Sequence, residues 1–365
     1  MRVRLEDVCE KESSKLKQSD VIDQNGLYPV YGASGYLGNI NTYQQSNYYI
    51  AVVKDGAGIG RTMLLPPESS IIGTMQYLIP KDNVLPEYLY YVVKAKHLEK
   101  YFSGATIPHI YFKDYKNEQF DLVSFEEQRV IINRLKKIEI IIDNLSKNLL
   151  LLDELVRARF VEMFGDVGMG LFNYQTCKLG DVAKVGSSHR VFTTEFVESG
   201  IPFYRGTEIG ELANGKKPIN PYYISEEHYK RLAEDETKPL IGDLLMPSIC
   251  NKGQVWMVDS EEPFYYKDGR VLCISPNKEV FNSRFLQYFM REKTLVEYPK
   301  IGSGSTFAEF KIFLLKDMDV LVPPLELQNQ FASFVQEIDK SRSRIQKSLE
   351  ASQELFDSLM QEYFG

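Results

Sequence analysis

Residues 125–165 read FEEQRVIINRLKKIEIIIDNLSKNLLLLDELVRARFVEMFG, and residues 325–365 read LELQNQFASFVQEIDKSRSRIQKSLEASQELFDSLMQEYFG. The two stretches align without a gap at an offset of 200 residues, and both carry Glu-x-Gln near the start and Phe-Gly at the end. Similarity at a fixed offset is the signature of a duplicated structural unit. The chain therefore contains an internal repeat, and a long amphipathic segment is its best-matched part.

Each long segment carries one narrow apolar stripe, which we call the helix seam. Its residues follow one another in alternating steps of four and three, the spacing of a coiled coil. In the first segment the seam consists of Ile131, Leu135, Ile138, Ile142, Leu145, Leu149, Leu152 and Val156. In the second segment the matching apolar residues are Phe331, Val335, Ile338, Ile345, Leu349 and Phe356. Arg342 and Ser352 interrupt the second stripe, and polar residues at such positions can fix register.

Residues typical of helix ends border both segments. Ser124 and Glu127 have the spacing of a capping box, in which each side chain satisfies a free backbone N–H of the other residue. The prolines at 323–324 precede the second segment, where proline is compatible with a first helical turn. Gly165 and Gly365 follow the last apolar residues and suit the left-handed conformation that ends many helices.

The lengths of the two segments predict how they pair. A helix over 125–164 would extend about 60 Å at 1.5 Å per residue, too far to be buried in one domain. Parallel pairing would force the chain to run back along the whole helix, and antiparallel pairing removes that requirement. We therefore predict an antiparallel pair with one globular module at each end and a pseudo-two-fold axis between the modules, a symmetry that matches the DNA backbone.

The segments between the helices read as globular and rich in strands. Short apolar runs separated by Gly, Pro and Asn predict strands, and 85–96 and 283–293 predict short helices. The predicted fold class is α+β, with two β-rich domains held apart by two long antiparallel coiled-coil helices in an internal repeat. The predicted divisions are a first module, a central helix, a second module and a C-terminal helix, at 1–124, 125–166, 167–322 and 323–365.

Composition excludes several classes of protein. The 365 residues are 44% hydrophobic and 25% charged, which is ordinary globular usage rather than disorder. A net charge of -7 argues against a protein that binds nucleic acid through a uniformly basic surface. No signal peptide or membrane span is evident, and Cys9, Cys177, Cys250 and Cys273 lack the spacing of a zinc site. We expect a cytoplasmic protein with no metal and no membrane partner.

Catalytic motifs are incomplete wherever they begin. Gly56, Gly58 and Gly60 are one residue short of the dinucleotide fingerprint, and no Gly-Lys-Ser or Gly-Lys-Thr closes a phosphate loop. The stretch 220–223 reads NPYY, with Tyr where an amino-methyltransferase tetrad has its second proline. The sequence therefore predicts that this chain is not an enzyme and that chemistry belongs to a partner.

The order of module, long helix, module, long helix resembles the DNA specificity subunit of type I restriction-modification enzymes. The resemblance covers the whole chain. It rests on FDLVSFEEQRVIINRLKKIE and VLVPPLELQNQFASFVQEID at the helix starts, on FVEMFGD at the first helix end, and on YPVYGASGYLG and GIPFYRGTEI in the modules.

The resemblance implies a protein without activity of its own. Its two target recognition domains would read the two halves of a split, asymmetric site in double-stranded DNA. Its helices would dock two modification subunits, which bring S-adenosylmethionine, and restriction subunits that use ATP and Mg would join that core. No cofactor is implied for this chain.

The resemblance places DNA contacts on the loops of the modules, where Gly lets backbone approach phosphate and Arg, Lys and Gln can reach base edges. In the first module the predicted DNA-contacting residues are Tyr31, Ser34, Lys54, Arg61, His109, Tyr111 and Lys113. In the second they are Ser188, His189, Arg190, Arg205, Lys252, Gln254, Ser305 and Thr306. His109 and His189 could equally be structural.

Three other interpretations remain open from the sequence. The chain could be an orphan specificity subunit that serves a methyltransferase without restriction. It could be a coiled-coil adaptor whose modules bind protein or polysaccharide, which predicts binding independent of DNA sequence. It could also be an enzyme with an unrecognised site, although no acid, base, nucleophile and ligand set is assembled in the sequence.

Overall fold

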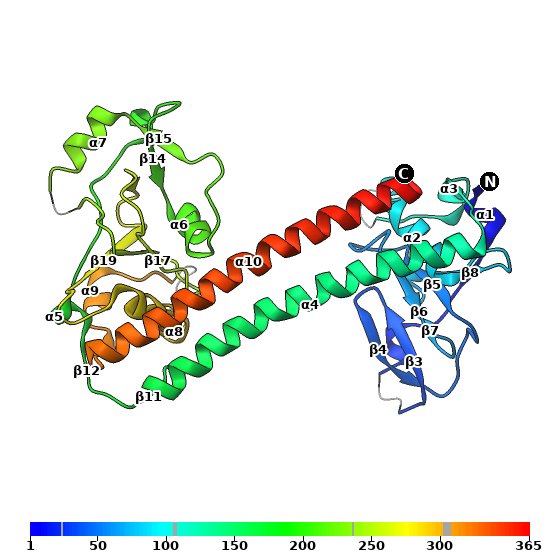
Figure 1. The fold of residues 1–365 in the computed structure, drawn as a ribbon, viewed down its shortest axis with the longest axis horizontal. Coiled ribbons are helices and arrows are strands. Elements are labelled where there is room, and N and C mark those ends of the chain that lie inside the picture. The colour runs from blue at the N-terminus through cyan, green and yellow to red at the C-terminus, as the bar shows by residue number, and fades with distance from the viewer. Residues whose placement is uncertain (23–24, 105–107, 236, 302–307) are drawn as a thin grey trace. The chain divides into compact units, whose positions relative to one another are not determined.

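The computed structural model describes residues 1–22, 25–104, 108–235, 237–301 and 308–365. The chain divides into two compact units, which we describe separately. The first unit comprises Met1–Asn148 with Arg344–Gly365, and the second comprises Leu149–Ser343. Each unit therefore contains one β-rich module together with part of both long helices (Figure 1). The predicted divisions at 124, 166 and 322 stay a prediction.

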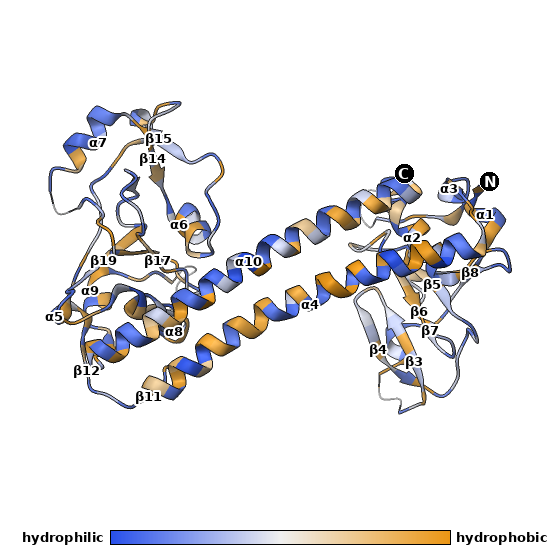
Figure 2. Cartoon of the chain, in the orientation of Figure 1, coloured by the Kyte–Doolittle hydropathy of each residue, from blue (hydrophilic) through white to orange (hydrophobic). Residues whose placement is uncertain are grey.

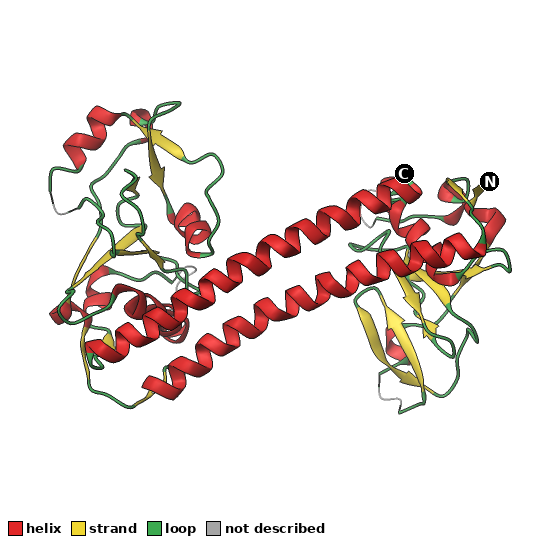
Figure 3. Cartoon of the chain, viewed as in Figure 1, coloured by secondary structure: helices red, strands yellow, loops and turns green. Residues whose placement is uncertain are grey.

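The first module is built from short strands and short helices (Figure 3). Its strands are β1 (Arg2–Arg4), β2 (Cys9–Ser13), β3 (Tyr28–Gly32), β4 (Gly35–Ile40), β5 (Tyr49–Val53), β6 (Thr62–Leu65), β7 (Ser70–Ile71), β8 (Met75–Pro80) and β9 (Gln119–Asp121). Its helices are α1 (Leu5–Val8), α2 (Pro86–Ala95) and α3 (Phe112–Tyr115), with 3-10 turns η1 (Gln18–Asp20) and η2 (Leu98–Tyr101).

The second module has the same kinds of element. Its strands are β10 (Gly165–Asp166), β11 (Leu171–Phe172), β12 (Thr176–Lys178), β13 (Ala183–Gly186), β14 (Ile201–Tyr204), β15 (Tyr222–Ile224), β16 (Leu244–Pro247), β17 (Trp256–Met257), β18 (Tyr265–Tyr266), β19 (Val271–Pro276) and β20 (Asp319–Leu321). Its helices are α5 (Leu179–Val182), η3 (Thr193–Glu195), α6 (Gly206–Ala213), α7 (Glu226–Leu232), α8 (Ser283–Ile301) and α9 (Ile312–Lys316).

The two modules share one sheet topology. The first module has a four-stranded sheet in the order β2-β8-β5-β6, a three-stranded sheet β4-β3-β7 and the pair β1-β9. The second repeats these as β13-β19-β16-β17, β15-β14-β18 and β12-β20. The mixture of parallel and antiparallel strand pairs is also repeated, because β3–β7 and β14–β18 are parallel whereas their neighbours are antiparallel. The predicted internal repeat and α+β fold are confirmed.

Equivalent backbone hydrogen bonds identify matching positions in the two modules. The N–H of Ile110 donates to the carbonyl of Lys54 at 2.9 Å, and the N–H of Phe310 donates to that of Ser248 at 2.8 Å. Both bonds tie the segment before the last short helix to the end of a central strand, β5 or β16. Position 110 of the first module therefore corresponds to 310 of the second, and 54 corresponds to 248.

The long helices α4 (Phe125–Phe164) and α10 (Leu325–Phe364) begin and end close to the predicted residues. The Ser124–Glu127 capping box is present, since the Ser124 N–H donates to Glu127 Oε2 at 3.1 Å and the Glu127 N–H donates to Ser124 Oγ at 3.3 Å. Gly165 ends α4 with φ +99°, the left-handed region that glycine adopts without strain. α8 runs to Ile301, beyond the expected end near residue 293.

A buried glutamine fastens the start of each long helix to its module. The side-chain oxygen of Gln128 accepts the N–H of Leu85 at 2.9 Å, and its nitrogen donates to the carbonyl of Val123 at 3.0 Å. Gln328 repeats the device, accepting the N–H of Asn282 at 3.0 Å. Both amides are almost completely buried, so these hydrogen bonds are needed to offset their desolvation.

Within the first unit, the end of α10 packs against the first half of α4. Phe356 and Phe364 are buried in one apolar cluster with Leu135 of α4 and the residues of α2. Arg134 Nη1 donates to the hydroxyl of Tyr363 at 2.9 Å, across the same pair of helices. Since the end of one helix lies beside the beginning of the other, the pairing is antiparallel.

Within the second unit, the end of α4 packs against the start of α10 in the same manner. The ring of Phe331 lies 5.3 Å from that of Phe160 and 5.7 Å from that of Phe164. Arg342, which interrupts the seam in the sequence, places Nη2 2.6 Å from Asp153 Oδ1. The predicted antiparallel pairing is therefore confirmed in each unit taken by itself.

The residues of the helix seam line the covered sides of α4 and α10. Each of them is buried or partly buried, and the exposed positions between them are mostly polar (Figure 2). Leu135 and Phe331 have no exposed surface, whereas Leu145 and Leu149 in the middle of α4 are partly exposed. Burial is therefore most complete at the helix ends, where a module also contacts the seam.

Replacing Phe331 with Ala is expected to lower the free energy of unfolding by about 3–5 kcal/mol, because the ring is fully buried among aromatic neighbours and its loss leaves a cavity. Leu151→Ala on the same unit is the control, since that side chain is 58% exposed and its loss should cost less than about 0.5 kcal/mol. Denaturant unfolding of both variants measures the difference. Equal midpoints would contradict this account of the core.

Candidate nucleic-acid interface

Three loops of the first module are joined by hydrogen bonds, and we call them the first loop cluster. They are the β3–β4 turn at 33–34, the β5–β6 loop at 54–61 and the segment 108–113. Arg61 Nη1 donates to the carbonyl of Ala33 at 2.6 Å, and the N–H of Gly56 donates to the carbonyl of Pro108 at 3.0 Å. The topology therefore brings together residues that lie more than 70 positions apart in the chain.

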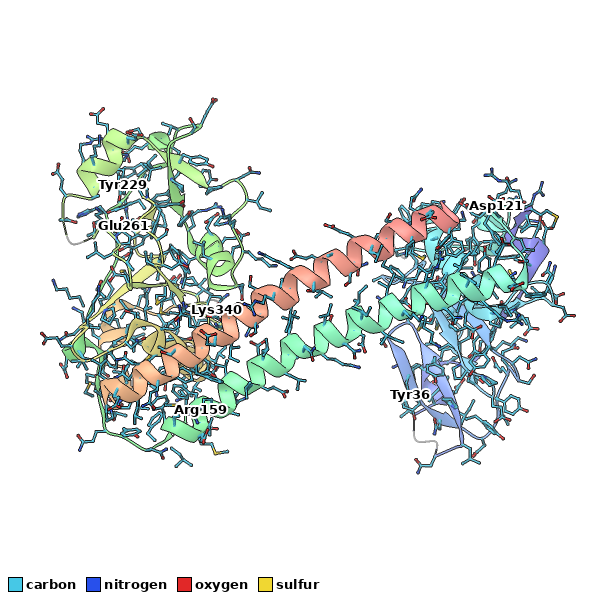
Figure 4. All side chains as sticks on the ribbon, viewed as in Figure 1. Tyr36, Asp121, Arg159, Tyr229, Glu261 and Lys340 are labelled. Atoms are coloured by element: carbon cyan, nitrogen blue, oxygen red, sulfur yellow. The ribbon has the colours of Figure 1, made fainter. Side chains whose placement is uncertain are left out.

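The turn of the first loop cluster presents aromatic and hydroxyl groups. Tyr31 is the next-to-last residue of β3 and is partly buried, and Ser34 lies exposed in the turn. Tyr36, which was not among the predicted residues, is 62% exposed and its ring lies 6.2 Å from that of Tyr31 (Figure 4). Aromatic rings at such a turn provide apolar contact area together with a polar hydroxyl group.

The other two loops of the first loop cluster meet at Asp55. His109 Nδ1 lies 2.7 Å from Asp55 Oδ1, and Lys54 Nζ lies 3.5 Å from the second oxygen of the same carboxylate. The ring of Tyr111 is stacked on that of His109 at 6.3 Å, and Lys113 Nζ lies 5.4 Å from the centre of the Tyr111 ring. Every DNA-contacting residue predicted in the first module thus belongs to this cluster or adjoins it.

The second module gathers part of its predicted set around β14 and β18. Ser188 Oγ donates to the carbonyl of Tyr266 in β18 at 2.6 Å, and Arg190 Nε donates to Asp268 Oδ2 at 3.2 Å. Arg205 follows the end of β14, which pairs with β18 at Tyr204 and Tyr266. Ser188, Arg190 and Arg205 therefore lie on neighbouring loops at one end of this sheet.

Arg205 is held in a fixed orientation. Its guanidinium contacts both oxygens of Glu208, at 2.5 Å to Oε1 and 3.2 Å to Oε2, and lies 4.5 Å from the centre of the Tyr222 ring. Burial raises the pKa of Glu208, but hydrogen bonds from Arg205 outweigh it and the pKa lies below its ordinary value. A guanidinium that is already oriented loses less conformational entropy when it contacts a base edge.

His189 is engaged by a carboxylate as well. Its Nε2 lies 2.6 Å from Asp235 Oδ2, and its backbone N–H donates to the hydroxyl of Tyr265 at 3.0 Å. The hydrogen bond from His189, with further bonds from Thr237, lowers the pKa of Asp235 to about 2. His189 thus has a structural contact in addition to its predicted role.

The remaining predicted residues form a separate loop or lie outside the described residues. The Gln254 side-chain oxygen accepts the backbone N–H of Lys252 at 3.0 Å, and the Lys252 side chain is exposed. This loop follows Ser248 and therefore corresponds to the β5–β6 loop of the first module. Ser305 and Thr306 lie outside the described residues.

The carboxylates that hold these side chains were not predicted from the sequence. Asp55, Asp235 and Asp268 contact partners 46 to 78 positions away, so neither spacing nor periodicity indicates them. Glu208 is different, because it lies three residues after Arg205 and completes a capping box at the start of α6. The Arg205–Glu208 contact is therefore the one among these that the spacing of residues in the sequence could have predicted.

Two further features bear on the function. Among the described residues, no group of three or more His, Cys, Asp and Glu side chains is arranged to hold a metal ion, and no helix is long and apolar enough to cross a membrane. In the NPYY stretch, Asn220 adopts φ +57° and β15 begins at Tyr222, so the stretch is a left-handed turn into a strand.

Comparison with known proteins identifies a single family. The family model described as the type I restriction modification DNA specificity domain matches residues 1–151 and 173–353. The type I restriction enzyme MjaIX specificity subunit of Methanocaldococcus jannaschii is 24% identical over 307 residues, which covers 78% of this chain and 69% of that protein.

Solved structures share the fold. The S subunit of a type I restriction-modification system from M. genitalium matches with a TM-score of 0.64 and 17% identity, covering 100% of this chain and 96% of that one. A chain from a structural study of complex assembly in a type I restriction-modification system matches with a TM-score of 0.53 and 15% identity, covering 100% and 97%.

Replacing His189 with Ala should raise the pKa of Asp235 from about 2 toward the ordinary aspartate value near 3.9, because the strongest hydrogen bond to the carboxylate is removed. A carboxyl group with a depressed pKa favours the folded state above pH 4, and this contribution is lost as pH falls toward 2. Carboxyl-detected NMR titration measures the shift. An unchanged pKa would show that the contact at 2.6 Å does not persist in solution.

Proposed function

We propose, from the premise that this chain belongs to the type I restriction modification DNA specificity family, that its two modules read the two halves of a split, asymmetric DNA site. One observation carries the proposal. The modules share their sheet topology, yet matching positions at the loops differ: His109 and Tyr111 in the first correspond to Glu309 and Lys311 in the second. Two modules with one framework and unlike loop side chains would contact DNA differently, which suits two unlike half-sites.

The chemistry of the loops supports recognition of base edges. In the first module, half-exposed rings such as Tyr111 and Tyr36 can make apolar contact with the methyl group of thymine or stack on a base. In the second module, Arg205 presents a planar guanidinium that is already oriented by Glu208, the geometry that suits guanine O6 and N7. Each such contact should be worth about 1–3 kcal/mol of discrimination.

The negative net charge of the chain is compatible with this function. A net charge of -7 weakens binding to DNA without regard to sequence, because that binding depends on neutralising many phosphates. Positive charge is instead local, and carboxylates such as Asp55 and Glu208 hold individual cations in place, Lys54 and Arg205 respectively. This arrangement favours specific over non-specific binding.

The proposed role needs no catalysis by this chain. Methyl transfer would be carried out by two modification subunits that bind S-adenosylmethionine, and cleavage by restriction subunits that use ATP and Mg. These partners and cofactors are expected from the family.

The outer side of α4 is suited to dock a modification subunit. In the first unit α4 leaves Ile140 and Ile141 about half exposed, and in the second unit it leaves Leu151 and Leu155 about half exposed. Scattered exposed apolar residues are common, but α4 carries eight exposed large apolar residues, of which Leu150 is the most exposed, and this number indicates a contact surface. Of the four matching residues of α10, Lys340 and Ser341 are polar, Ala351 is small, and Leu355 is a large apolar residue that is 52% exposed. The exposed apolar surface is therefore larger on α4, which we expect to be the stronger docking helix.

Co-expression with the modification subunit, followed by genome-wide mapping of methylated adenines, should give one motif of two specified halves separated by a fixed gap. Tyr111→Ala in the first module should relax one half only, and Arg205→Lys in the second should relax the other half only. The lysine keeps a positive charge on Glu208 but loses the planar fork.

The matched control is Tyr48→Ala, an exposed tyrosine at the opposite end of β5 from Lys54, which should leave the motif unchanged. Relaxation of both halves by either variant would contradict the assignment of one half to each module. Binding of the wild-type complex with equal affinity to every duplex would refute the proposed function itself.

Leu151→Glu should weaken binding of the modification subunit about tenfold or more, because burying one leucine is worth about 1.5–3 kcal/mol and a buried charge would add a penalty. The matched control is Ala351→Glu, which adds the same charge at the equivalent exposed position of α10. Co-purification and analytical ultracentrifugation compare the two. Equal retention of the modification subunit would argue against docking on α4.

A further inference from the structure

Two basic residues of one loop in the second module, Lys267 and Arg270, have no role in the preceding account. This loop joins β18 to β19 at residues 267–270 and carries Lys267, Asp268, Gly269 and Arg270. The loop is fixed by Ser187, whose hydroxyl accepts the N–H of Gly269 at 2.9 Å and donates to the carbonyl of Val271 at 2.8 Å. Gly269 adopts φ +62°, so the turn depends on a residue that tolerates the left-handed region.

Asp268 holds two cations at this loop. Arg190 Nε and Lys267 Nζ each lie 3.2 Å from one of its oxygens. The carboxylate side chain is 18% exposed, whereas Arg190 is 67% exposed and Lys267 is 34% exposed. Burial raises the pKa of Asp268, but the hydrogen bond from Arg190 and the neighbouring charge of Lys267 outweigh it, and the pKa lies below its ordinary value. The carboxylate therefore lies beneath the cations and remains ionised.

Glu309 holds a second pair of cations. Lys311 Nζ lies 2.6 Å from Glu309 Oε2, and Arg270 Nη1 contacts Oε1 of the same carboxylate. Glu309 is 16% exposed, whereas Arg270 and Lys311 are 58% and 55% exposed. The arrangement at Asp268 is thus repeated, and Arg270 and Asp268 connect the two pairs because they lie two residues apart on one turn.

The two pairs together leave an excess of positive charge. Four cations surround two carboxylates, and the cations are the more exposed groups in both pairs. A carboxylate beneath each pair orients the basic side chains, which lowers the entropy lost when they contact an anion. Phosphodiester oxygens are the acceptors that suit clustered Arg and Lys donors.

We propose that Arg190, Lys267, Arg270 and Lys311 form a clamp for backbone phosphates of duplex DNA, which positions the second module on its half-site. The inference rests on the proposed function and deepens it, because it gives this cluster a role in register rather than in reading sequence. Ser188 and Arg205, on the neighbouring loops, place the clamp beside the predicted base-reading residues.

The clamp distinguishes the two modules. Positions 309 and 311 correspond to His109 and Tyr111 of the first module. Those two rings stack on each other and do not form a carboxylate–cation pair such as Glu309–Lys311. Contacts of the second module should therefore depend more strongly on salt than those of the first.

The test uses the complex of this chain with its modification subunits and measures the dissociation constant of labelled duplexes by fluorescence anisotropy. The salt concentration is varied from about 50 to about 300 mM, a range that includes physiological ionic strength, where the Debye length is about 8 Å. Arg270→Gln with Lys311→Gln should weaken binding to cognate and mismatched duplexes by the same factor. The slope of log affinity against log salt should fall by about one for each lost phosphate contact, and the methylated motif should not change.

Two further variants keep the test independent of folding. Arg270→Lys retains a point charge and should retain affinity. Glu309→Gln removes one negative charge from the cluster but also the group that orients both cations. We expect the gain in net positive charge to outweigh the lost orientation, so that this variant binds every duplex more tightly. The matched control is Lys178→Gln with Lys316→Gln, which removes one partly buried and one exposed charge of the same module near the β12–β20 sheet and should leave the slope unchanged.

Three outcomes would overturn the clamp. An unchanged salt slope in the Arg270 and Lys311 double variant would exclude phosphate contact. Relaxation of one motif position would assign the cluster to base reading instead. Loss of the modification subunit with an unchanged slope would assign it to a protein interface. In each case the wild-type complex still prefers its motif, whereas failure of the proposed function would abolish that preference.

Discussion

The structure depends on the burial of aromatic and aliphatic side chains where the end of one long helix meets the beginning of the other. In the first unit Phe356 and Phe364 share a core with Leu135, and in the second Phe160 and Phe164 share a core with Phe331. Each of these clusters also includes residues of the adjoining module. Hydrophobic burial at the helix ends therefore stabilises the helix pair and fixes the module to it in a single step.

The duplicated framework and the diverged loops follow different physical constraints. Sheet order and backbone hydrogen bonds such as those at Ile110 and Phe310 depend on geometry that many sequences satisfy, so both copies retain them. Loop side chains contribute little to the core and can change without unfolding the module. A framework of this kind allows the two modules to present different chemistry, aromatic in the first and charged in the second, to unlike halves of a target.

A recurrent device in the loops is a carboxylate that orients basic side chains. Asp55, Glu208, Asp268 and Glu309 each contact at least one Arg, Lys or His near a candidate DNA-binding surface. The carboxylate limits net positive charge and reduces the freedom of its partner. An acidic chain can thereby bind a polyanion at defined points, because local orientation replaces the general attraction that a basic surface would supply.

The sequence by itself determined the repeat, the helix seam and the helix ends, because heptad spacing and a capping box such as Ser124–Glu127 act between residues a few positions apart. It also identified most loops of the candidate interface by their glycines. Only the tertiary structure decided which loop residues meet, since contacts such as His109–Asp55 and Arg190–Asp268 join residues 54 and 78 positions apart. Such contacts depend on strand order and register, and those emerge only when the apolar faces of the whole module pack together.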